Sequence, residues 1–285
     1  MFVKPFRYVR VHDVDEACEL LRKEDEAKVL AGGQSLLPLI NAGLVEPGLL
    51  VDIAHVPSMT GVARSDGYLE IGALTCHAEL ASNVEVRVGQ PLLACAARHV
   101  GNPRIRNRGT IGGSLAHADP AAELPLALTA LGATVVATDG RTVREIKADE
   151  FAVSYLSTQL RTDELVAHLR VPLLGPGWGW SFMELSRRNG DFAIVAVAVL
   201  LRCADGHAVE ARVAAAGVGV RPVRLGGVEA ALSGAARQEY LGRLGPIREV
   251  DPVSDAVASA EYRRHLLATL VRRGVDEAFA RSEER

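Results

Sequence analysis

Cysteine is scarce in this sequence, and none of the spacings that hold a metal is present. The chain has four cysteines in 285 residues: Cys18, Cys76, Cys95 and Cys203. They lie far apart and form no CxxC pair, whereas iron–sulfur and structural zinc sites need thiolates grouped at short spacing. We therefore expect no metal site on this chain.

The histidines form no metal-binding pattern either. His77, His99 and His117 lie among apolar or small residues, without the HxxxH or HExxH spacing that places two ligands on one helix face. We interpret them as structural or surface residues.

The chain also lacks an excess of positive charge and any long apolar run. Its 32 Lys and Arg residues against 35 Asp and Glu give a formal net charge of -3, which disfavours wrapping nucleic acid or binding an anionic membrane. No apolar stretch reaches the roughly 18 residues that span a bilayer, and residues 1–17 contain no continuous apolar h-region. We expect a cytoplasmic protein whose partners are small molecules or proteins.

What the chain does have is enough length and apolar content for two packed domains, with 48% hydrophobic residues and 24% charged. Proline and glycine are concentrated in PLLGPGWG (172–179), a composition typical of a domain boundary. We place the boundary near residue 176. The prediction is a first domain over 1–175, with subdomains of about 1–54 and 55–175, and a second domain over 176–285.

The first subdomain reads as a small βαβ-like unit. VDEACELLRK (14–23) has helical periodicity, AKVLA follows as a strand ending at Gly32-Gly33, Ser35 can cap the next helix, and LLVDI (49–53) is a second strand.

The second subdomain reads as a larger mixed α/β unit. We expect a helix starting at Thr75, a buried helix over 90–99, and a helix that Asp119-Pro120 starts and Gly132 ends. A hairpin should turn at Asp139-Gly140.

Beyond residue 176, short strands such as AIVAVAVLLR and EARVAAAGV precede a long amphipathic helix at the end of the chain. The prediction for this domain is a small antiparallel sheet with helices. The whole chain is thus of the α+β class.

Two glycine-bearing segments carry the clearest chemical signal. They are AGGQS (31–35) and GTIGGS (109–114). Glycine lets the backbone come close to a ligand, so successive N–H groups can converge on phosphate oxygens, and the hydroxyls add donors. Two such loops could hold a pyrophosphate from either side, although each GG pair alone is also typical of a plain turn. Neither segment matches GxxxxGK[ST] or the Rossmann GxGxxG.

Four segments resemble one family. VLAGGQSLLPLI (29–40), GNPRIRNRGTIGGSLAHADPAAELPLAL (101–128), RRNGDFAIVAVAV (187–199) and SAEYRRHLLATLVRRGV (259–275) closely resemble the medium, FAD-binding subunits of the xanthine dehydrogenase and carbon monoxide dehydrogenase family of molybdenum hydroxylases. The matches occur in order over nearly the whole chain.

The resemblance implies that noncovalent FAD binds between the two glycine segments, with its pyrophosphate held by both. The residues that inherit this role are Ala31, Gly32, Gly33, Gln34, Ser35, Thr110, Ile111, Gly112, Gly113 and Ser114, and Leu36 is a further predicted cofactor-binding residue.

Three further residues match flavin-site positions of the family, and each has a simpler alternative. Glu123 stands where the family usually has an aspartate that contacts FAD, but it could be a solvated carboxylate at a helix start. Leu165 matches a leucine that lines the flavin site, but it could be ordinary core. Phe192 matches an aromatic near the isoalloxazine ring, but it could be strand packing.

Two charged features remain open. Glu184 stands where many relatives have a lysine near the flavin; a carboxylate there would oppose anionic reduced flavin, and we assign it no role. Arg104, Arg106 and Arg108 alternate in PRIRNR, which would place them on one face if the segment were extended. They are either a solvated rim or a contact for a ligand or partner.

The resemblance further implies a division of labour. A large subunit with molybdopterin would act on the organic substrate, a small subunit would carry two [2Fe–2S] clusters, and this chain would pass their electrons to NAD, oxygen, a quinone or another carrier, in a dimer of heterotrimers. No residue of this chain would then be catalytic toward the organic substrate. The alternatives are a self-sufficient FAD oxidoreductase of the related fold and a noncatalytic assembly subunit.

Overall fold

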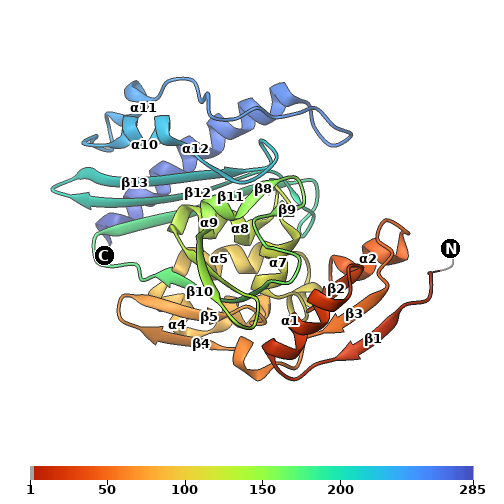
Figure 1. Cartoon of the computed structure of the whole chain (residues 1–285). Coiled ribbons are helices and arrows are strands. Elements are labelled where there is room, and N and C mark those ends of the chain that lie inside the picture. The colour runs from red at the N-terminus through yellow and green to blue at the C-terminus, as the bar shows by residue number, and fades with distance from the viewer. Residues whose placement is uncertain (1–2, 285) are drawn as a thin grey trace.

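The first part of the chain forms a three-stranded parallel sheet in the computed structural model, which describes residues 3–284 (Figure 1). The strand order is β1-β3-β2, and the βαβ-like unit expected from the sequence is confirmed. Its elements are β1 (Arg7–Arg10), α1 (Val14–Lys23), β2 (Ala27–Leu30), α2 (Leu36–Asn41) and β3 (Leu49–Asp52). Helix α1 begins where the Asp13 side chain accepts a hydrogen bond from the Glu16 N–H.

The second part is built on a five-stranded antiparallel sheet of order β4-β5-β10-β6-β7, with helices packed against it. The strands are β4 (Val62–Ser65), β5 (Tyr68–Gly72), β6 (Thr134–Thr138), β7 (Val143–Lys147) and β10 (Leu165–Pro172), with a separate hairpin of β8 (Ala152–Ser154) and β9 (Ser157–Thr158). The helices are η1 (Pro57–Met59), α3 (His77–Ser82), α4 (Val84–Gly89), α5 (Pro91–His99), α6 (Pro103–Arg106), α7 (Ile111–His117), α8 (Glu123–Leu131) and α9 (Ala148–Phe151). The hairpin predicted at Asp139-Gly140 joins β6 to β7.

The last part is a four-stranded antiparallel sheet of order β11-β12-β13-β14, covered by a long helix. Its elements are β11 (Trp178–Ser186), β12 (Ala193–Ala204), β13 (His207–Ala216), β14 (Val223–Arg224), α10 (Gly226–Leu232), α11 (Tyr240–Arg243) and α12 (Ala260–Glu283). The small antiparallel sheet with helices is confirmed. None of the helices within residues 3–284 is long and apolar enough to cross a membrane.

The central strand β12 is buried on both faces, which explains its nearly continuous apolar sequence. Its alanines Ala196 and Ala198 face the core shared with α8, and its valines Val197 and Val199 face α12. Figure 1 shows α5 and α8 on one side of this sheet and α12 on the other. The small side chains let α8 lie close to the sheet, so the two domains share a core.

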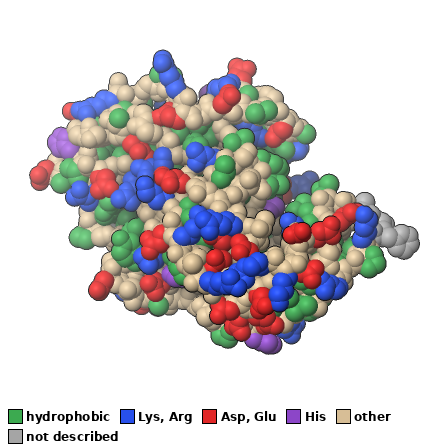
Figure 2. Space-filling model, in the orientation of Figure 1, with side chains coloured by type: hydrophobic (Ala, Val, Ile, Leu, Met, Phe, Trp, Pro, Cys, Tyr) green, Lys and Arg blue, Asp and Glu red, His purple; other side chains and the backbone are tan. Residues whose placement is uncertain are grey.

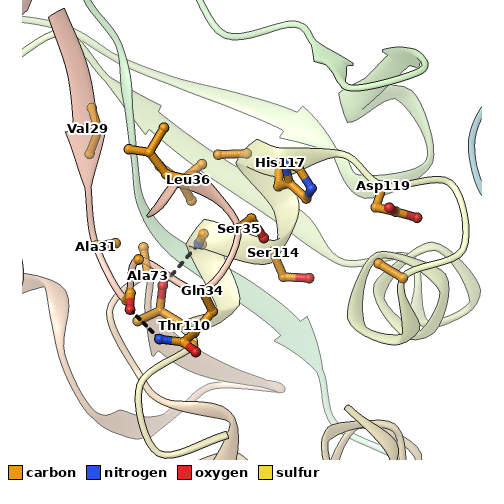
Figure 3. A pocket seen from close by; sticks show the side chains of 18 of the residues that line it. Val29, Ala31, Gln34, Ser35, Leu36, Ala73, Thr110, Ser114, His117 and Asp119 are labelled. Atoms are coloured by element: carbon orange, nitrogen blue, oxygen red, sulfur yellow. Dashed lines mark hydrogen bonds between the residues drawn. The ribbon is translucent and has the colours of Figure 1, made fainter. Parts of the chain in front are cut away.

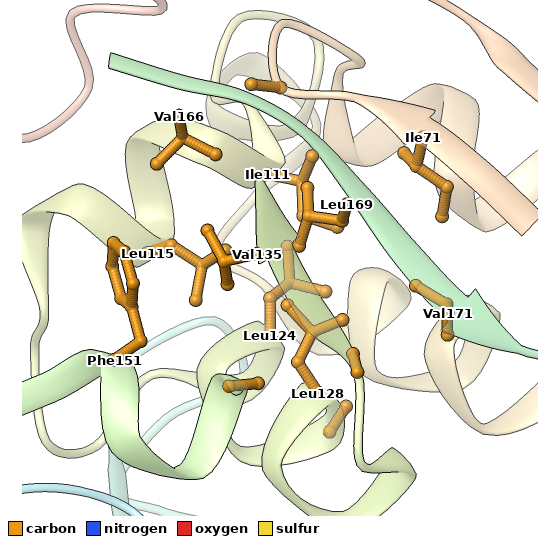
Figure 4. Close-up of a cluster of buried hydrophobic side chains, with 14 of the residues drawn as sticks. Ile71, Ile111, Leu115, Leu124, Leu128, Val135, Phe151, Val166, Leu169 and Val171 are labelled. Atoms are coloured by element: carbon orange, nitrogen blue, oxygen red, sulfur yellow. The ribbon is translucent and has the colours of Figure 1, made fainter. Parts of the chain in front are cut away.

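The larger core lies between α7, α8 and the five-stranded sheet (Figure 4). Ile111 and Leu115 of α7, Leu124 and Leu128 of α8, and Phe151 all point into it and are at most 2% exposed. Because α7 starts at the second glycine segment, this packing fixes where that segment lies.

Charged side chains of both signs intermix on the face shown in Figure 2. This distribution matches the formal net charge of -3 and leaves no uniformly basic area on that face.

Two helix starts differ from the prediction, and a third helix lacks the predicted side-chain cap. Helix α3 begins at His77, because Thr75 instead donates its hydroxyl to the Gly61 carbonyl. Helix α8 begins at Glu123, because the Asp119 carboxylate accepts from the Ala121 N–H and forms a turn. Ser35 does precede α2, but its hydroxyl caps no N–H group.

We predict that Gly179→Ala destabilises the C-terminal part of the chain. A Cβ on Gly179 would collide with the Ala278 carbonyl oxygen of α12 and lie 2.7 Å from the Ser282 nitrogen. Overpacking against backbone costs about 1–3 kcal/mol or more, so the denaturant midpoint should fall. Gly226→Ala is the control, since its Cβ would meet no atom within 4 Å; equal midpoints for both variants would contradict the prediction.

Candidate functional site

A cavity of about 550 Å³ lies between the first subdomain and the helices that follow the second glycine segment. Figure 3 shows Ser35 and Leu36 from one side and Ser114 and His117 of α7 from the other, directed at the same space. Of the predicted site residues, those that line the cavity are Ala31, Gly32, Gly33, Gln34, Ser35, Leu36, Thr110, Gly112, Gly113, Ser114, Glu123, Leu165 and Phe192. Ile111 is the exception, because its side chain is fully buried in the core.

The two glycine segments touch each other through their backbones. A Cβ on Gly32 would collide with the Arg108 carbonyl oxygen and lie 2.9 Å from the Gly109 Cα. A Cβ on Gly112 would lie 2.5 Å from the Ala73 Cβ. Both positions therefore require glycine for close approach, and the two loops form one continuous wall of the cavity.

The first loop presents unpaired amides to the cavity. Within residues 3–284, the N–H groups of Gly33, Gln34 and Ser35 make no hydrogen bond to another residue. Gly33 has a positive φ of 72°, and the Gln34 side chain donates to the Gly32 carbonyl at 3.0 Å, which holds the turn. Successive free amides in a glycine turn are suited to bind an anion.

The second loop differs from the expectation that both loops donate amides. The Ile111 N–H donates to the Thr75 carbonyl at 3.1 Å and the Gly112 N–H to the Ala73 carbonyl at 2.8 Å. Thr110 caps α7 by accepting from the Gly113 N–H at 3.1 Å, the bond drawn in Figure 3. These amides hold the loop against its neighbours, so its contribution to the cavity is the Ser114 hydroxyl and close-lying glycine backbone.

His77 is a cavity residue that sequence reasoning missed. It lies at the start of α3, is 4% exposed, and its Nδ1 has no hydrogen-bond partner within residues 3–284. Burial, with the nearby charge of Arg106, lowers the pKa of His77 to about 4, so the ring is neutral at physiological pH. No local pattern marks it, because its backbone N–H bonds the carbonyl of Gly109 in the second glycine segment, which lies 32 positions further along the chain.

Glu123 is buried in the cavity wall and is not solvated. It is 4% exposed, so its interpretation as a solvated helix-start carboxylate is wrong. Burial raises the pKa of Glu123 to about 7, and the charges of Glu184 and Asp119 add to the rise. This carboxyl group therefore titrates close to neutral pH.

Leu165 and Phe192 both line the cavity but differ in burial. Leu165 is 3% exposed and belongs to the main core as well as to the cavity wall. Phe192 lies in the turn before β12 and is 60% exposed, which rules out strand packing. An exposed aromatic ring at the cavity rim can contact a planar ligand there.

The arginines of PRIRNR do not share one face. Pro103–Arg106 is a helical turn rather than an extended segment. The Arg106 guanidinium donates to the Val100 and Gly101 carbonyls at 2.9 and 2.8 Å, so it holds the loop together, whereas Arg104 and Arg108 are exposed.

Family models match both domains of the chain. Residues 4–174 match the FAD binding domain in molybdopterin dehydrogenase, and residues 180–278 match the CO dehydrogenase flavoprotein C-terminal domain. The chain belongs to the family of medium, FAD-binding subunits of molybdenum hydroxylases. It is therefore an oxidoreductase subunit, and FAD is the cofactor of its first domain.

Curated relatives align with this medium subunit over nearly its whole length. It is 36% identical to the nicotine 6-hydroxylase medium subunit of Paenarthrobacter nicotinovorans, over 99% of this chain and 100% of that one. It is 32% identical to the carbon monoxide dehydrogenase medium chain of Hydrogenophaga pseudoflava, over 97% and 98%.

Solved structures share its fold. A chain of carbon monoxide dehydrogenase from Hydrogenophaga pseudoflava, in a form that lacks the Mo-pyranopterin moiety, superposes with a TM-score of 0.94 at 34% identity over 99% of both chains. A chain of quinoline 2-oxidoreductase from Pseudomonas putida 86 gives 0.91 at 32% identity, over 98% of this subunit and 99% of that chain.

The cavity of this subunit suits FAD chemically. The free amides of the first loop and the Ser35 and Ser114 hydroxyls, which bond no other residue within 3–284, match a pyrophosphate. The apolar walls at Leu36, Leu165 and Phe192 suit an aromatic ring system.

We predict that Glu123→Gln stabilises this subunit more at alkaline than at acidic pH. Between pH 4.5 and about 7 the Glu123 carboxyl group keeps its proton in the folded chain, whereas in the unfolded chain, where its pKa is near 4.5, it has lost that proton. The resulting stabilisation is complete below pH 4.5 and is lost as the pH rises through about 7. An amide does not titrate, so the free energy of unfolding of the variant, relative to that of wild type, should rise by on the order of 1–3 kcal/mol as the pH increases between those limits.

Denaturant unfolding across this pH range measures the difference, with exposed Glu70→Gln as the control. A constant difference between Glu123→Gln and wild type at every pH would show that Glu123 does not titrate there.

Proposed function

We propose that this medium subunit transfers electrons within a molybdenum hydroxylase complex. It takes them from [2Fe–2S] clusters of a small partner subunit and passes them to NAD, oxygen, a quinone or another carrier. FAD, when bound, supplies the chemistry of accepting electrons singly and releasing them in pairs.

The arrangement of the cavity wall is the observation that carries this proposal. The first loop offers free amides for a pyrophosphate, and Phe192 at the rim is 60% exposed. A flavin anchored by the loop and directed toward Phe192 would have its ring near the protein surface, within reach of a redox partner. The residues of this chain bind, orient and partly shield the cofactor.

Its partners, we propose, are a large molybdopterin subunit and the small iron–sulfur subunit, assembled as a dimer of heterotrimers. Relatives that match it end to end are named medium chains or subunits of complexes, such as the 6-hydroxypseudooxynicotine dehydrogenase complex of Paenarthrobacter nicotinovorans. Copurification of the tagged chain from its native cells tests this, with metal analysis for molybdenum and iron.

The copurified protein also distinguishes the two alternative functions. Yellow protein that reduces an acceptor without any partner would favour a self-sufficient FAD oxidoreductase. Colourless protein that FAD cannot reconstitute would favour a noncatalytic assembly subunit.

We predict that Gly32→Ala weakens FAD binding about tenfold or more. The added methyl group collides with the Arg108 carbonyl and forces the two loops apart; a cost of about 1–3 kcal/mol corresponds to that loss of affinity. Titration of the apoprotein by flavin fluorescence measures it. Gly242→Ala on α11 meets no atom within 4 Å and should bind normally; wild-type affinity in Gly32→Ala would refute the role of this contact.

A further inference from the structure

A second cavity, of about 400 Å³, lies in the second domain and shares no lining residue with the first. Its floor is one face of α12, where Leu267, Ala268 and Val271 recur at helical spacing. Its opposite wall is the segment 244–250, which connects α11 to α12. Cavities of this size hold small molecules, so this one is a candidate ligand site separate from the cavity that suits FAD.

The lining of this second cavity is mainly apolar and comes from both sides. Leu267 and Val271 of α12 are each 1% exposed, and Val228 of α10 is 4% exposed. On the opposite wall, Leu244 and Ile247 are half-buried against the same core. A hydrocarbon chain would bury its surface against these side chains, so the ligand should have an apolar body.

The segment that forms the opposite wall is held by side chains and not by backbone pairing. Within residues 3–284, the backbone groups of residues 245–250 make no hydrogen bond to other backbone groups. The Glu249 carboxylate instead accepts from the Gly227 N–H, at the start of α10, and from the Arg248 N–H at 2.9 Å. A wall held in this way can adjust to the shape of a ligand.

Two arginines of α12 give the second cavity its charge. Arg264 and Arg272 both line it, and both are exposed. They are eight residues apart, which places their backbones about 12 Å apart along the helix. Arg264 pairs with Asp251 at 3.5 Å, and the Asp251 side chain is 99% exposed. Arg272 makes no salt bridge within the described residues, so its guanidinium is the cation available to a ligand.

We propose that the second cavity binds an amphipathic carboxylate, whose hydrocarbon chain lies on the α12 floor and whose carboxylate pairs with the Arg272 guanidinium. A planar guanidinium binds a carboxylate through two parallel hydrogen bonds, and the adjoining apolar floor requires a chain attached to that carboxylate. The inference goes beyond the proposed function and does not depend on it, because the two cavities share no residue.

Isothermal titration of the full-length chain with decanoate tests the proposal. FAD is present in excess, so that decanoate does not enter the first cavity. We expect saturable binding of one decanoate per chain. Decanol lacks the charge and propionate lacks the long chain, so each should bind at least about tenfold more weakly than decanoate.

Variants of α12 assign the binding to this cavity. Arg272→Gln should weaken decanoate binding about tenfold or more, because the charged donor is lost. Arg273→Gln is the matched control, since Arg273 is exposed and does not line the cavity; it removes the same charge and should leave the affinity unchanged. Ala268→Trp fills the space above the floor and should abolish binding, with its thermal midpoint showing whether the chain remains folded.

The contrary outcomes are distinct from failure of the proposed function. Wild type without saturable decanoate binding, or Ala268→Trp that is folded and still binds, overturns the site. Equal affinities of Arg272→Gln and Arg273→Gln, or decanol bound as tightly as decanoate, overturn the pairing with Arg272. A second copy of the chain in this cavity would appear in sedimentation as a dimer that Ala268→Trp disrupts, and would also overturn the proposal. None of these results bears on whether the first cavity binds FAD.

Discussion

The close backbone contact between Gly32 and the Arg108–Gly109 peptide is the constraint on which the site depends. It joins a loop of the first subdomain to the loop that starts α7 and leaves no room for a side chain. Because α7 is packed into the main core through Ile111 and Leu115, the contact ties the first loop, with its free amides, to that core.

The two loops use their backbone amides differently. Amides of the first loop are unpaired and available to an anion, whereas those of Ile111, Gly112 and Gly113 donate hydrogen bonds that hold the second loop in place. A free amide is costly unless a ligand or water pairs with it. The unpaired amides of the first loop can therefore pair with water or a ligand, whereas the paired amides hold the second loop in place.

The second domain contributes more than a scaffold. Its central strand β12 places small alanines toward α8, so the helix that begins at Glu123 packs closely on the sheet. Phe192 reaches the cavity from the turn before the same strand. The cavity is thus finished by residues that lie more than 60 positions beyond the second glycine loop in the sequence.

The fold class, the family and the predicted site residues could all be read from the sequence, because glycine loops, periodicity and the TIGGS segment are local patterns. Of those predicted residues, only Ile111 does not line the cavity. Only the tertiary structure decided which amides are free, that His77 faces the cavity, that Glu123 is buried, and that Arg104, Arg106 and Arg108 do not align. The arginines diverge because Pro103–Arg106 forms a helical turn, whereas the other three findings depend on contacts between residues distant in the chain, such as Gly109 with His77. Burial and hydrogen-bond pairing arise from such contacts, and no local pattern encodes them.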